Sequence, residues 1–401
     1  MIEPIMITGA GIVSAIGNNK AETLSALLHR RSGIAPLRYL QSSHMELPVG
    51  EVKLSNEQMK QMLGIDREPT TRTMLMGMLA LQEALSEAGL TSAAQRPIAL
   101  VSGTTVGGMD KSEQYYPSFL ADDSHIDYLR THACGATTEL IASRFGLFST
   151  VTTTSTACSS AANALILGAN LIRSGRVPMA VVGGAECITK FHLNGFNSLM
   201  ILDPRQCRPF DATRAGLNLG EGAAYLVLET AASASQRGAK VIGHLSGYGN
   251  ACDAFHQTAS SDEGEGAYLA MSKALAMAGL NPTDIDYVNA HGTGTPNNDA
   301  SESRALQRLF GRQLPPISST KGMTGHTTSA SGAVEAIICL LALQHGFVPV
   351  NYGWTQPMQG GIVPAMTSEP PRPLHHALCN SFGFGGNDSS FILTKHDDDA
   401  Q

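Results

Sequence analysis

The chain has 401 residues, of which 43% are hydrophobic and 15% are charged, so it can bury one large core or two joined ones, as a globular protein does. Its formal net charge of −7 argues against nucleic acid as the main partner. The 7 cysteines are odd in number and form no CxxC pair, which does not resemble a disulfide framework or a zinc site and favours a reducing cytoplasm.

The first residues, MIEPIMITGAGIVSAIG, have no basic segment ahead of the apolar one, so we do not expect a signal peptide. A dinucleotide-binding motif could be read into Gly9 and Gly11, but Ser14 stands where that fingerprint requires its third glycine. A later apolar run, residues 333–350, carries Glu335 and is too short for a membrane span of roughly 20 apolar residues. We therefore expect a soluble, cytoplasmic protein without a membrane span.

Short apolar runs alternate along the chain with runs rich in alanine and leucine. PIMIT precedes KAETLSALLHRR, RPIALVSG follows TTRTMLMGMLALQEALSEAGL, and MAVVGGAE follows AANALILGANLIRSG. Runs of the first kind are typical of buried strands, and runs of the second kind are typical of helices. The alternation predicts an α/β fold built in layers.

The sequence also contains an internal repeat. ALSEAGL at residues 84–90 is followed by a strand-like run and a Gly-Thr pair, and ALAMAGL at residues 274–280 is followed by the same combination. Common helix endings with a glycine cap could produce this by coincidence. We expect instead two halves of similar build, joined near residues 231–245: an N-terminal half, residues 1–240, and a C-terminal half, residues 241–397.

One cysteine has an unusual setting. Cys158, in STACSS, lies between a Thr-rich strand-like run and a run of Ala, Ser and small aliphatic residues that predicts a helix. The first turn of a helix has unpaired N–H groups and a partial positive charge, which favour the thiolate form of a nearby cysteine. A lone cysteine in such a place is more often structural, so this motif alone leaves a buried thiol and a nucleophile both open.

Two histidines lie in polar, glycine-rich turns. His291 follows a strand-like run in NAHGTGTPNND, and His326 follows Lys321 by five positions in STKGMTGHTTSASGAVEAI, ahead of an apolar helix that contains Glu335. A single histidine in a loop is usually only solvated. Two of them in Gly/Thr turns after strands, together with Cys158 in the same setting, indicate a catalytic site.

A fourth motif is ALCNSFGFGGNDSS, in which a strand breaks into Gly383, Gly385 and Gly386. Glycines can bring backbone N–H groups close to a ligand oxygen, as an oxyanion site requires. The alternative is a glycine-rich hairpin turn.

These four motifs, in their order and spacing, resemble those of β-ketoacyl-acyl-carrier-protein synthases of the decarboxylating Cys-His-His type, similar to synthases I and II. The resemblance extends over almost the whole chain, from ITGAGIVSAIG to SSFILTK. It implies the thiolase fold, an α/β fold with five αβαβα layers made of two similar halves. It also implies a β-ketoacyl synthase, an acyltransferase of fatty-acid or polyketide synthesis.

The resemblance implies a role for each motif. Cys158 would take an acyl group as a thioester from the phosphopantetheine of an acyl carrier protein, and the backbone N–H groups of Cys158 and Phe384 would bind the thioester oxygen. His291 and His326 would stabilise the enolate that forms when malonyl carrier protein loses carbon dioxide. That carbanion would attack the thioester and lengthen the chain by two carbons.

Further residues are expected to support the site. Lys321 and Glu335 would hold His326 and its loop, or simply form an ion pair. Phe384 matches a gating phenylalanine of the family, and Val106 and Phe196 match residues that shape the acyl tunnel, although both could be plain core. The full expected substrate-binding set is Val106, Phe196, Thr293, Thr295, Phe384 and Gly385. No bound cofactor and no metal are expected, because decarboxylation itself generates the nucleophile.

The sequence departs from the housekeeping fatty-acid enzymes in two loops. Asn298 and Asp299 stand in PNND, where those enzymes have a glycine before the aspartate, and Leu217 and Asn218 stand in RAGLNLGEG in place of an Asp-Gly-Phe-Val run. The segments GTTVGGM and GLNLGEG are more similar to those of synthases from aryl polyene and flexirubin clusters. We hold that pathway as a hypothesis.

The expected partners are an acyl carrier protein and a second synthase subunit, in a homodimer or in a heterodimer with a chain-length-factor-like protein. Few basic residues stand where a carrier would dock; Arg67 and Arg72 remain. The alternative function is a partner-dependent or non-catalytic chain-length subunit, although such a subunit would lack Cys158. A thiolase would need a second cysteine in the C-terminal loop, where NSFGFGG has none.

Overall fold

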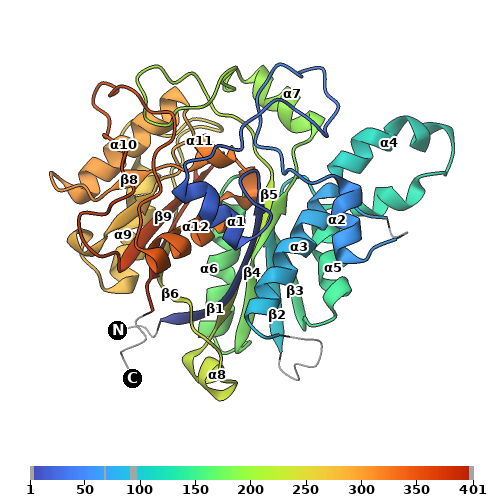
Figure 1. Ribbon diagram of the computed structural model, residues 1–401, viewed down its shortest axis with the longest axis horizontal. Helices are drawn as coiled ribbons and strands as arrows, with labels where there is room; N and C mark the ends of the chain where they lie inside the picture. Colours follow the sequence, from blue (N-terminus) through green and yellow to red (C-terminus); the bar gives the residue numbers. More distant parts are fainter. Residues whose placement is uncertain (1–3, 67–68, 91–96, 397–401) are drawn as a thin grey trace.

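A computed structural model describes residues 4–66, 69–90 and 97–396 (Figure 1). The strands are β1 (Ile5–Ser14), β2 (Ile98–Gly103), β3 (Thr150–Thr154), β4 (Met179–Glu186), β5 (Gly222–Glu229), β6 (Gly243–Cys252), β7 (Tyr287–Asn289), β8 (Ile317–Ser318), β9 (His376–Gly383) and β10 (Asn387–Thr394). The α-helices are α1 (Lys20–Leu28), α2 (Asn56–Leu63), α3 (Arg72–Glu87), α4 (Met109–Ala121), α5 (Cys134–Phe145), α6 (Ser160–Arg173), α7 (Lys190–Ser198), α8 (Ala231–Gln236), α9 (Glu265–Ala278), α10 (Pro296–Phe310), α11 (Lys321–Thr324) and α12 (Ser331–His345). Short 3-10 helices are η1 (Ile126–Thr131), η2 (Pro282–Asp284) and η3 (Thr328–Ala330).

The ten strands of the described residues form one mixed sheet in the order β3-β2-β4-β5-β1-β6-β10-β9-β7-β8. In the first half, β1 and β5 pair antiparallel, as do β5 and β4, and then β4, β2 and β3 run parallel. The second half repeats this pattern, with β6 in the place of β1, then β10, β9, β7 and β8. The halves meet where β1 pairs with β6. The predicted internal repeat therefore corresponds to a repeated topology.

Helices cover the sheet in three layers, so the fold has five layers in total. α6 and α12 pack together between the halves and share a core with strands of both. α3 and α5 cover the first half on its outer side, and α9 and α10 cover the second half. Figure 1 shows α9 and α10 on the left, α6 and α12 in the centre and α3 and α5 on the right. This is the predicted α/β architecture of αβαβα layers.

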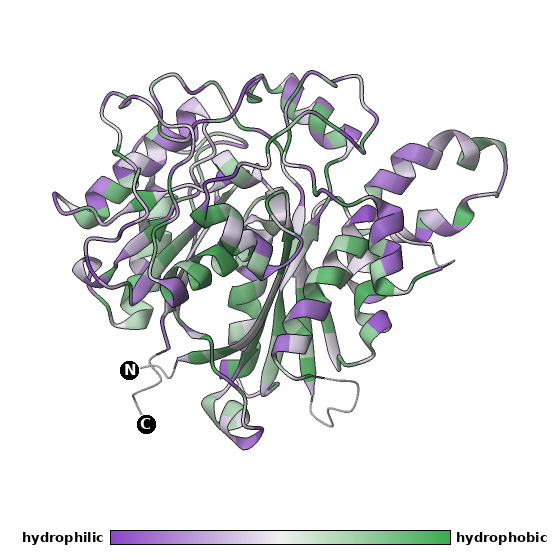
Figure 2. Ribbon diagram, in the orientation of Figure 1, coloured by the Kyte–Doolittle hydropathy of each residue, from purple (hydrophilic) through white to green (hydrophobic). Residues whose placement is uncertain are grey.

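The predicted apolar run forms α12, a helix with no solvent-facing side. Every residue from Ser331 to Leu343 is buried, including Glu335. Figure 2 shows the apolar residues along the strands and the central helices, with polar residues on the outer helices. Within the described residues, no helix has the length and hydropathy needed to cross a bilayer.

Small residues let the central helices approach each other. A Cβ atom added to Gly332 in α12 would lie 2.7 Å from the Ala162 backbone nitrogen in α6, and one added to Gly103 in β2 would lie 2.7 Å from the Ala161 nitrogen. Both distances are below any real contact of this kind. The run of Ala, Ser and Gly after Cys158 is thus needed for packing, and it fixes the start of α6 against both neighbours.

Arg72 does not have the exposed position expected of a carrier-docking residue. It is 7% exposed, and its Nε atom lies 2.9 Å from both carboxylate oxygens of Glu221. Its guanidinium also donates to the Leu54 and Val52 carbonyls. Burial alone would lower the pKa of Arg72, but Glu221 raises it above its ordinary value. The expectation of a docking role for Arg72 is therefore wrong, and Arg67 lies outside the described residues.

Replacing Glu221 with Gln should strongly destabilise the fold, because it leaves the Arg72 cation buried without a counter-charge. We expect the free energy of unfolding to fall by about 3–5 kcal/mol, measured by urea denaturation. The matched control is Glu263→Gln, which removes an exposed ion pair 3.9 Å long with Arg304. That change should stay within about 0.5 kcal/mol of the wild type. Equal effects of the two substitutions would contradict this account of the buried pair.

Candidate active site

Cys158 lies in a tight turn between β3 and α6. Its neighbour Ala157 has a φ of 52°, in the left-handed region that non-glycine residues rarely adopt. The Ser381 hydroxyl of β9 donates to the Cys158 carbonyl at 2.9 Å, which ties this turn to the second half of the sheet. The Cys158 side chain is 4% exposed. The turn therefore holds the sulfur at the junction of the two halves, in a strained backbone of the kind found at functional sites.

The environment of the Cys158 thiol differs from that expected of a thiolate at a helix start. Burial raises the pKa of Cys158 to about 12, against the lowering effects of the Lys321 cation and of the backbone N–H groups of Phe384 and Cys158. Desolvation of the sulfur thus outweighs the favourable dipole. The thiol is protonated at neutral pH until a ligand or a base changes its surroundings.

His326 contacts the sulfur directly. Its Nε2 lies 3.1 Å from the Cys158 Sγ, and its Nδ1 lies 3.1 Å from the Ser331 hydroxyl at the start of α12. The backbone N–H of His326 donates to the Asn218 carbonyl at 2.8 Å. The imidazole is thus oriented from both ring nitrogens, on a loop whose backbone is also fixed.

His291 lies beside His326, with ring centroids 5.3 Å apart and the rings at 83°. Glu302 of α10 accepts the backbone N–H groups of His291 and Gly292 at 2.8 and 2.7 Å, and the Lys321 ammonium donates to the His291 carbonyl at 2.6 Å. Within the described residues, the buried His291 Nδ1 has no hydrogen-bond partner. The backbone of His291 is therefore held from two sides, while its ring keeps hydrogen-bonding capacity.

Lys321 and Glu335 form a fully buried ion pair. Burial raises the pKa of Glu335 to about 7, although Lys321 opposes this rise. The ammonium reaches the carbonyl of His291, so the residue that Lys321 holds directly is His291 rather than His326. Burial, and then the Lys321 charge, also lower the pKa of both histidines well below the ordinary value. Both imidazoles are therefore neutral, and each can offer one N–H to a ligand.

A cavity of about 370 Å³ is lined by Cys158, His291 and His326. Its walls include five of the six expected substrate-binding residues: Phe196, Thr293, Thr295, Phe384 and Gly385. The rings of Phe196 and Phe384 stack with centroids 5.8 Å apart. Val106 does not line the cavity; it is 2% exposed and belongs to the core beneath α3.

Several cavity residues were not singled out from the sequence as binding residues. Asp253 and His256 lie after β6. Asp388 is the second residue of β10, directly after the glycine-rich turn. The His256 Nδ1 accepts the backbone N–H groups of Thr258 and Ala259 in the same loop. Asp253 and Asp388 could not be recognised as neighbours from the sequence, because the pairing of β6 with β10 brings them together.

Asp388 is a buried carboxyl group that faces the cavity. It is 5% exposed, and burial, followed by repulsion from Asp253 and Glu302, raises its pKa to about 8. Asp253 in contrast accepts three hydrogen bonds, from Ser261 and Gly266. Asp388 therefore keeps its proton at neutral pH.

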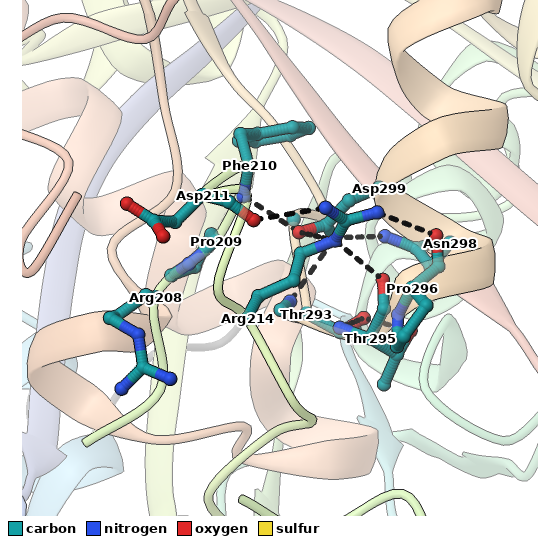
Figure 3. A network of polar contacts seen from close by, with 12 residues as sticks. Arg208, Pro209, Phe210, Asp211, Arg214, Thr293, Thr295, Pro296, Asn298 and Asp299 are labelled. Atoms are coloured by element: carbon teal, nitrogen blue, oxygen red, sulfur yellow. Dashed lines mark hydrogen bonds and ion pairs between the residues drawn. The ribbon is translucent and has the colours of Figure 1, made fainter. Parts of the chain in front are cut away.

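The two loops that depart from the housekeeping enzymes are held by hydrogen bonds. Asn298, which stands where those enzymes have glycine, donates to the Asp299 carboxylate at 3.1 Å. Asp299 accepts the backbone N–H groups of Phe210 and Gly294 at 2.7 and 3.1 Å, and the Arg214 Nε lies 3.6 Å from its carboxylate (Figure 3). Arg214 also donates to the Asp211 and Pro296 carbonyls (Figure 3). This network joins the turn after His291 to the loop that precedes β5.

In the loop before β5, Leu217 and Asn218 stand in place of the Asp-Gly-Phe-Val run of the housekeeping enzymes. The Asn218 side chain accepts the Cys207 N–H at 2.7 Å and donates to the Asp203 and Arg205 carbonyls at 3.0 and 2.9 Å. Leu217 lines the cavity. The polar residue thus holds the loop together, and its apolar neighbour forms part of the wall.

Comparison with known proteins identifies relatives over almost the whole chain. The family model "Beta-ketoacyl synthase, N-terminal domain" matches residues 2–234, and "Beta-ketoacyl synthase, C-terminal domain" matches residues 242–355. Nodulation protein E of Rhizobium meliloti (strain 1021) is 34% identical over 402 residues, which cover 96% of this chain and 97% of that protein. The 3-oxoacyl-[acyl-carrier-protein] synthase 2 of Vibrio harveyi is 32% identical and covers 98% of both chains.

Solved structures agree with this similarity. The ishigamide ketosynthase/chain length factor superposes with a TM-score of 0.90 at 31% identity, over 98% of this chain and 100% of that one. The ketosynthase ApeO, in complex with its chain length factor ApeC from Xenorhabdus doucetiae, gives a TM-score of 0.85 at 31% identity, over 98% of each chain. The five-layered fold is the thiolase fold of these ketosynthases.

The Asp388 carboxyl group should make stability depend on pH. Because the folded state holds this proton up to about pH 8 and the unfolded state releases it near 3.8, the free energy of unfolding falls as the pH rises between these values. Asp388→Asn cannot ionise and should lack this slope. Relative to the variant, the wild type should lose roughly 1–3 kcal/mol between about pH 6 and about pH 9, measured by urea denaturation at each pH. The control is the exposed Asp262→Asn; the account fails if the Asp388→Asn and wild-type profiles run parallel.

Proposed function

The chain belongs to the β-ketoacyl synthase family, and we propose that Cys158, His291 and His326 are its catalytic residues. It is a β-ketoacyl-acyl-carrier-protein synthase, which condenses an acyl group with malonyl-acyl carrier protein. The observation that carries the assignment is the 3.1 Å contact between the Cys158 Sγ and the His326 Nε2, with the His291 ring beside them at the end of one cavity.

In the first step, the Cys158 sulfur attacks the carbonyl of an acyl group carried on the phosphopantetheine of an acyl carrier protein. The new carbon–sulfur bond replaces the bond to the carrier, and the thiol proton leaves with the carrier sulfur, so this step has no net proton change. The backbone N–H groups of Cys158 and Phe384, which point at the sulfur, are suited to hold the thioester oxygen. The thiol form of resting Cys158 protects it from side reactions until the substrate arrives.

In the second step, malonyl carrier protein loses carbon dioxide and its thioester carbonyl becomes an enolate. His291 and His326 are neutral, so each can donate one imidazole N–H to this oxygen as negative charge develops on it. The enolate carbon then attacks the acyl-Cys158 carbonyl and expels the sulfur, which takes up one proton. The product stays on the carrier, longer by two carbons.

Lys321 and Glu335 do not touch the substrate. They position His291, and the Lys321 charge affects the pKa of the two histidines. Lys321 holds the His291 carbonyl, and its charge disfavours protonation of both rings. Phe196 and Phe384 would form a gate, because their stacked rings stand in the cavity wall. Thr293, Thr295 and Gly385 would contact the phosphopantetheine or the acyl group, while Val106 would act only through the shape of the core.

The pathway and partners form a second part of the proposal. We infer that this chain is the active subunit of a pair with a chain-length-factor-like protein, since the two solved ketosynthases named above occur with chain length factors. A homodimer is the alternative. The presence of Cys158, His291 and His326 together disfavours the alternative of a non-catalytic chain-length subunit. We also propose a cytoplasmic location, because a reducing compartment suits the free thiols of the cysteines. We also assign the nucleophile to a half of residues 1–240 and the histidines to a half of residues 241–397.

The nucleophile can be tested by intact mass spectrometry after mixing the protein with carrier proteins that bear short, long and polyene acyl chains. We expect a gain of one acyl group in the wild type and none in Cys158→Ala. Cys207→Ala, which removes another buried thiol, is the control and should still be acylated. No gain with any donor in the folded wild type would contradict the assignment, and addition of a candidate partner subunit would then test partner dependence.

The histidines can be separated from the nucleophile by following carbon dioxide release. His291→Ala should still form the acyl-Cys158 thioester, but its decarboxylation of malonyl carrier protein should fall by about 10²–10³-fold, as for the loss of one oxyanion donor. His256→Ala, in the cavity wall but outside the pair of imidazoles, should lose much less. Decarboxylation at the wild-type rate in His291→Ala would refute this role.

A further inference from the structure

Three exposed apolar side chains lie on two segments that contribute residues to the wall of the active-site cavity. Leu199 and Met200 lie at the end of α7 and line the cavity, and Phe255 lies in the loop after β6, next to the lining residue His256. Their exposed fractions are 43%, 88% and 59%. We call Leu199, Met200 and Phe255 the apolar rim. Figure 1 shows α7 at the top of the molecule, among loops rather than under another layer.

The backbone at Met200 indicates that its exposure is not incidental. Met200 follows the C-cap residue Leu199 of α7 and has a φ of 57°. This position after a helix favours glycine, because other residues pay a steric cost in the left-handed region. The Met200 side chain gains almost no burial in return. Neither helix termination nor the core explains a methionine here, which points to a contact outside the chain.

Charge around the cavity does not favour an acidic partner. No described lining residue is Lys or Arg, whereas Asp253 is in the wall. The nearby Arg208 and Arg214 are engaged in ion pairs with Asp203 and Asp299. On the segment that follows the rim, the exposed cation is Arg205. Attraction between a basic patch and an acidic carrier, the usual source of salt-sensitive docking, is therefore weak at this mouth.

We propose that an acyl carrier protein docks on the apolar rim mainly through apolar contacts, with little dependence on ionic strength. The inference rests on the proposed function, since a carrier must deliver its thioester through this mouth to reach Cys158. Continuity argues for a carrier rather than a second copy of the chain: Leu199 and Met200 belong both to the outer surface and to the wall of the cavity. Methionine suits such a surface because its flexible side chain adapts to its partner.

The test compares acylation by a carrier with acylation by a free thioester. The carrier is the one that acylates the wild type fastest in the mass assay above, and the free donor is the N-acetylcysteamine thioester of the same acyl group, which needs no docking. For Met200→Ser, kcat/KM with the carrier should fall at least about 10-fold more than with the free thioester, as expected for the loss of about 1.4 kcal/mol of contact. Phe255→Ser, on a different element, should act in the same direction.

Two variants serve as controls. Met366→Ser removes an exposed methionine near the outer edge strand β8, and Arg205→Ala removes the nearby cation; both should leave the ratio of the two activities within about 2-fold of the wild type. For the wild type, kcat/KM with the carrier should change by less than about 3-fold between about 50 and about 300 mM salt, where exposed ion pairs are strongly screened.

Other results would overturn the inference. A steep salt dependence, or a loss in Arg205→Ala as large as in Met200→Ser, would mean that docking is ionic. An unchanged ratio in both rim variants would mean that the rim is not the docking surface. Failure of the wild type with the carrier and with the free thioester alike would instead refute the proposed nucleophile, which keeps the two proposals distinguishable.

Discussion

The site depends on a single buried cation. The Lys321 ammonium lies between the His291 carbonyl, just after β7, and the Glu335 carboxylate, near the start of α12. Burial lowers the pKa of both imidazoles and the Lys321 charge lowers it further, so that each histidine stays neutral. The same charge opposes the rise that burial causes in the pKa of Cys158. A cation without a partner could not remain there, and Glu335 supplies the counter-charge in a helix that is otherwise apolar. The Lys321–Glu335 ion pair therefore contributes both to the stability of the fold and to the protonation state of the histidines.

Buried carboxylates also explain how polar, glycine-rich loops can be rigid. Glu302 and Asp299 accept backbone N–H groups on either side of the His291 turn, and Glu186 accepts the N–H and hydroxyl groups of Thr105 after β2. Each carboxylate satisfies donors that would otherwise be buried without partners. The loops around the cavity are therefore fixed by hydrogen bonds rather than by apolar packing, which leaves their inner surface free for substrate.

Much of the fold and of the proposed catalytic set could be predicted from the sequence, because both depend on local patterns. Alternating runs predict the layers, and Cys158 and His291 stand out by the turns that contain them. Long-range contacts are less accessible. That Lys321 reaches His291 depends on the pairing of β7 with β8, the burial of Arg72 depends on Glu221 far along the chain, and Asp388 meets its neighbour only across two strands. A pattern read along the chain has no information on such distances.

The repeated topology has a consequence for how such a site arises. The Cys158 turn joins β3 to α6, and the segment with His326 joins β8 to α12, so Cys158 and His326 occupy equivalent places in the two halves. The same strand-to-helix connection therefore occurs twice in the fold, and both copies open onto one cavity that Cys158 and His326 line. One repeated scaffold thus supplies two matching places for reactive side chains, a thiol in one half and an imidazole in the other.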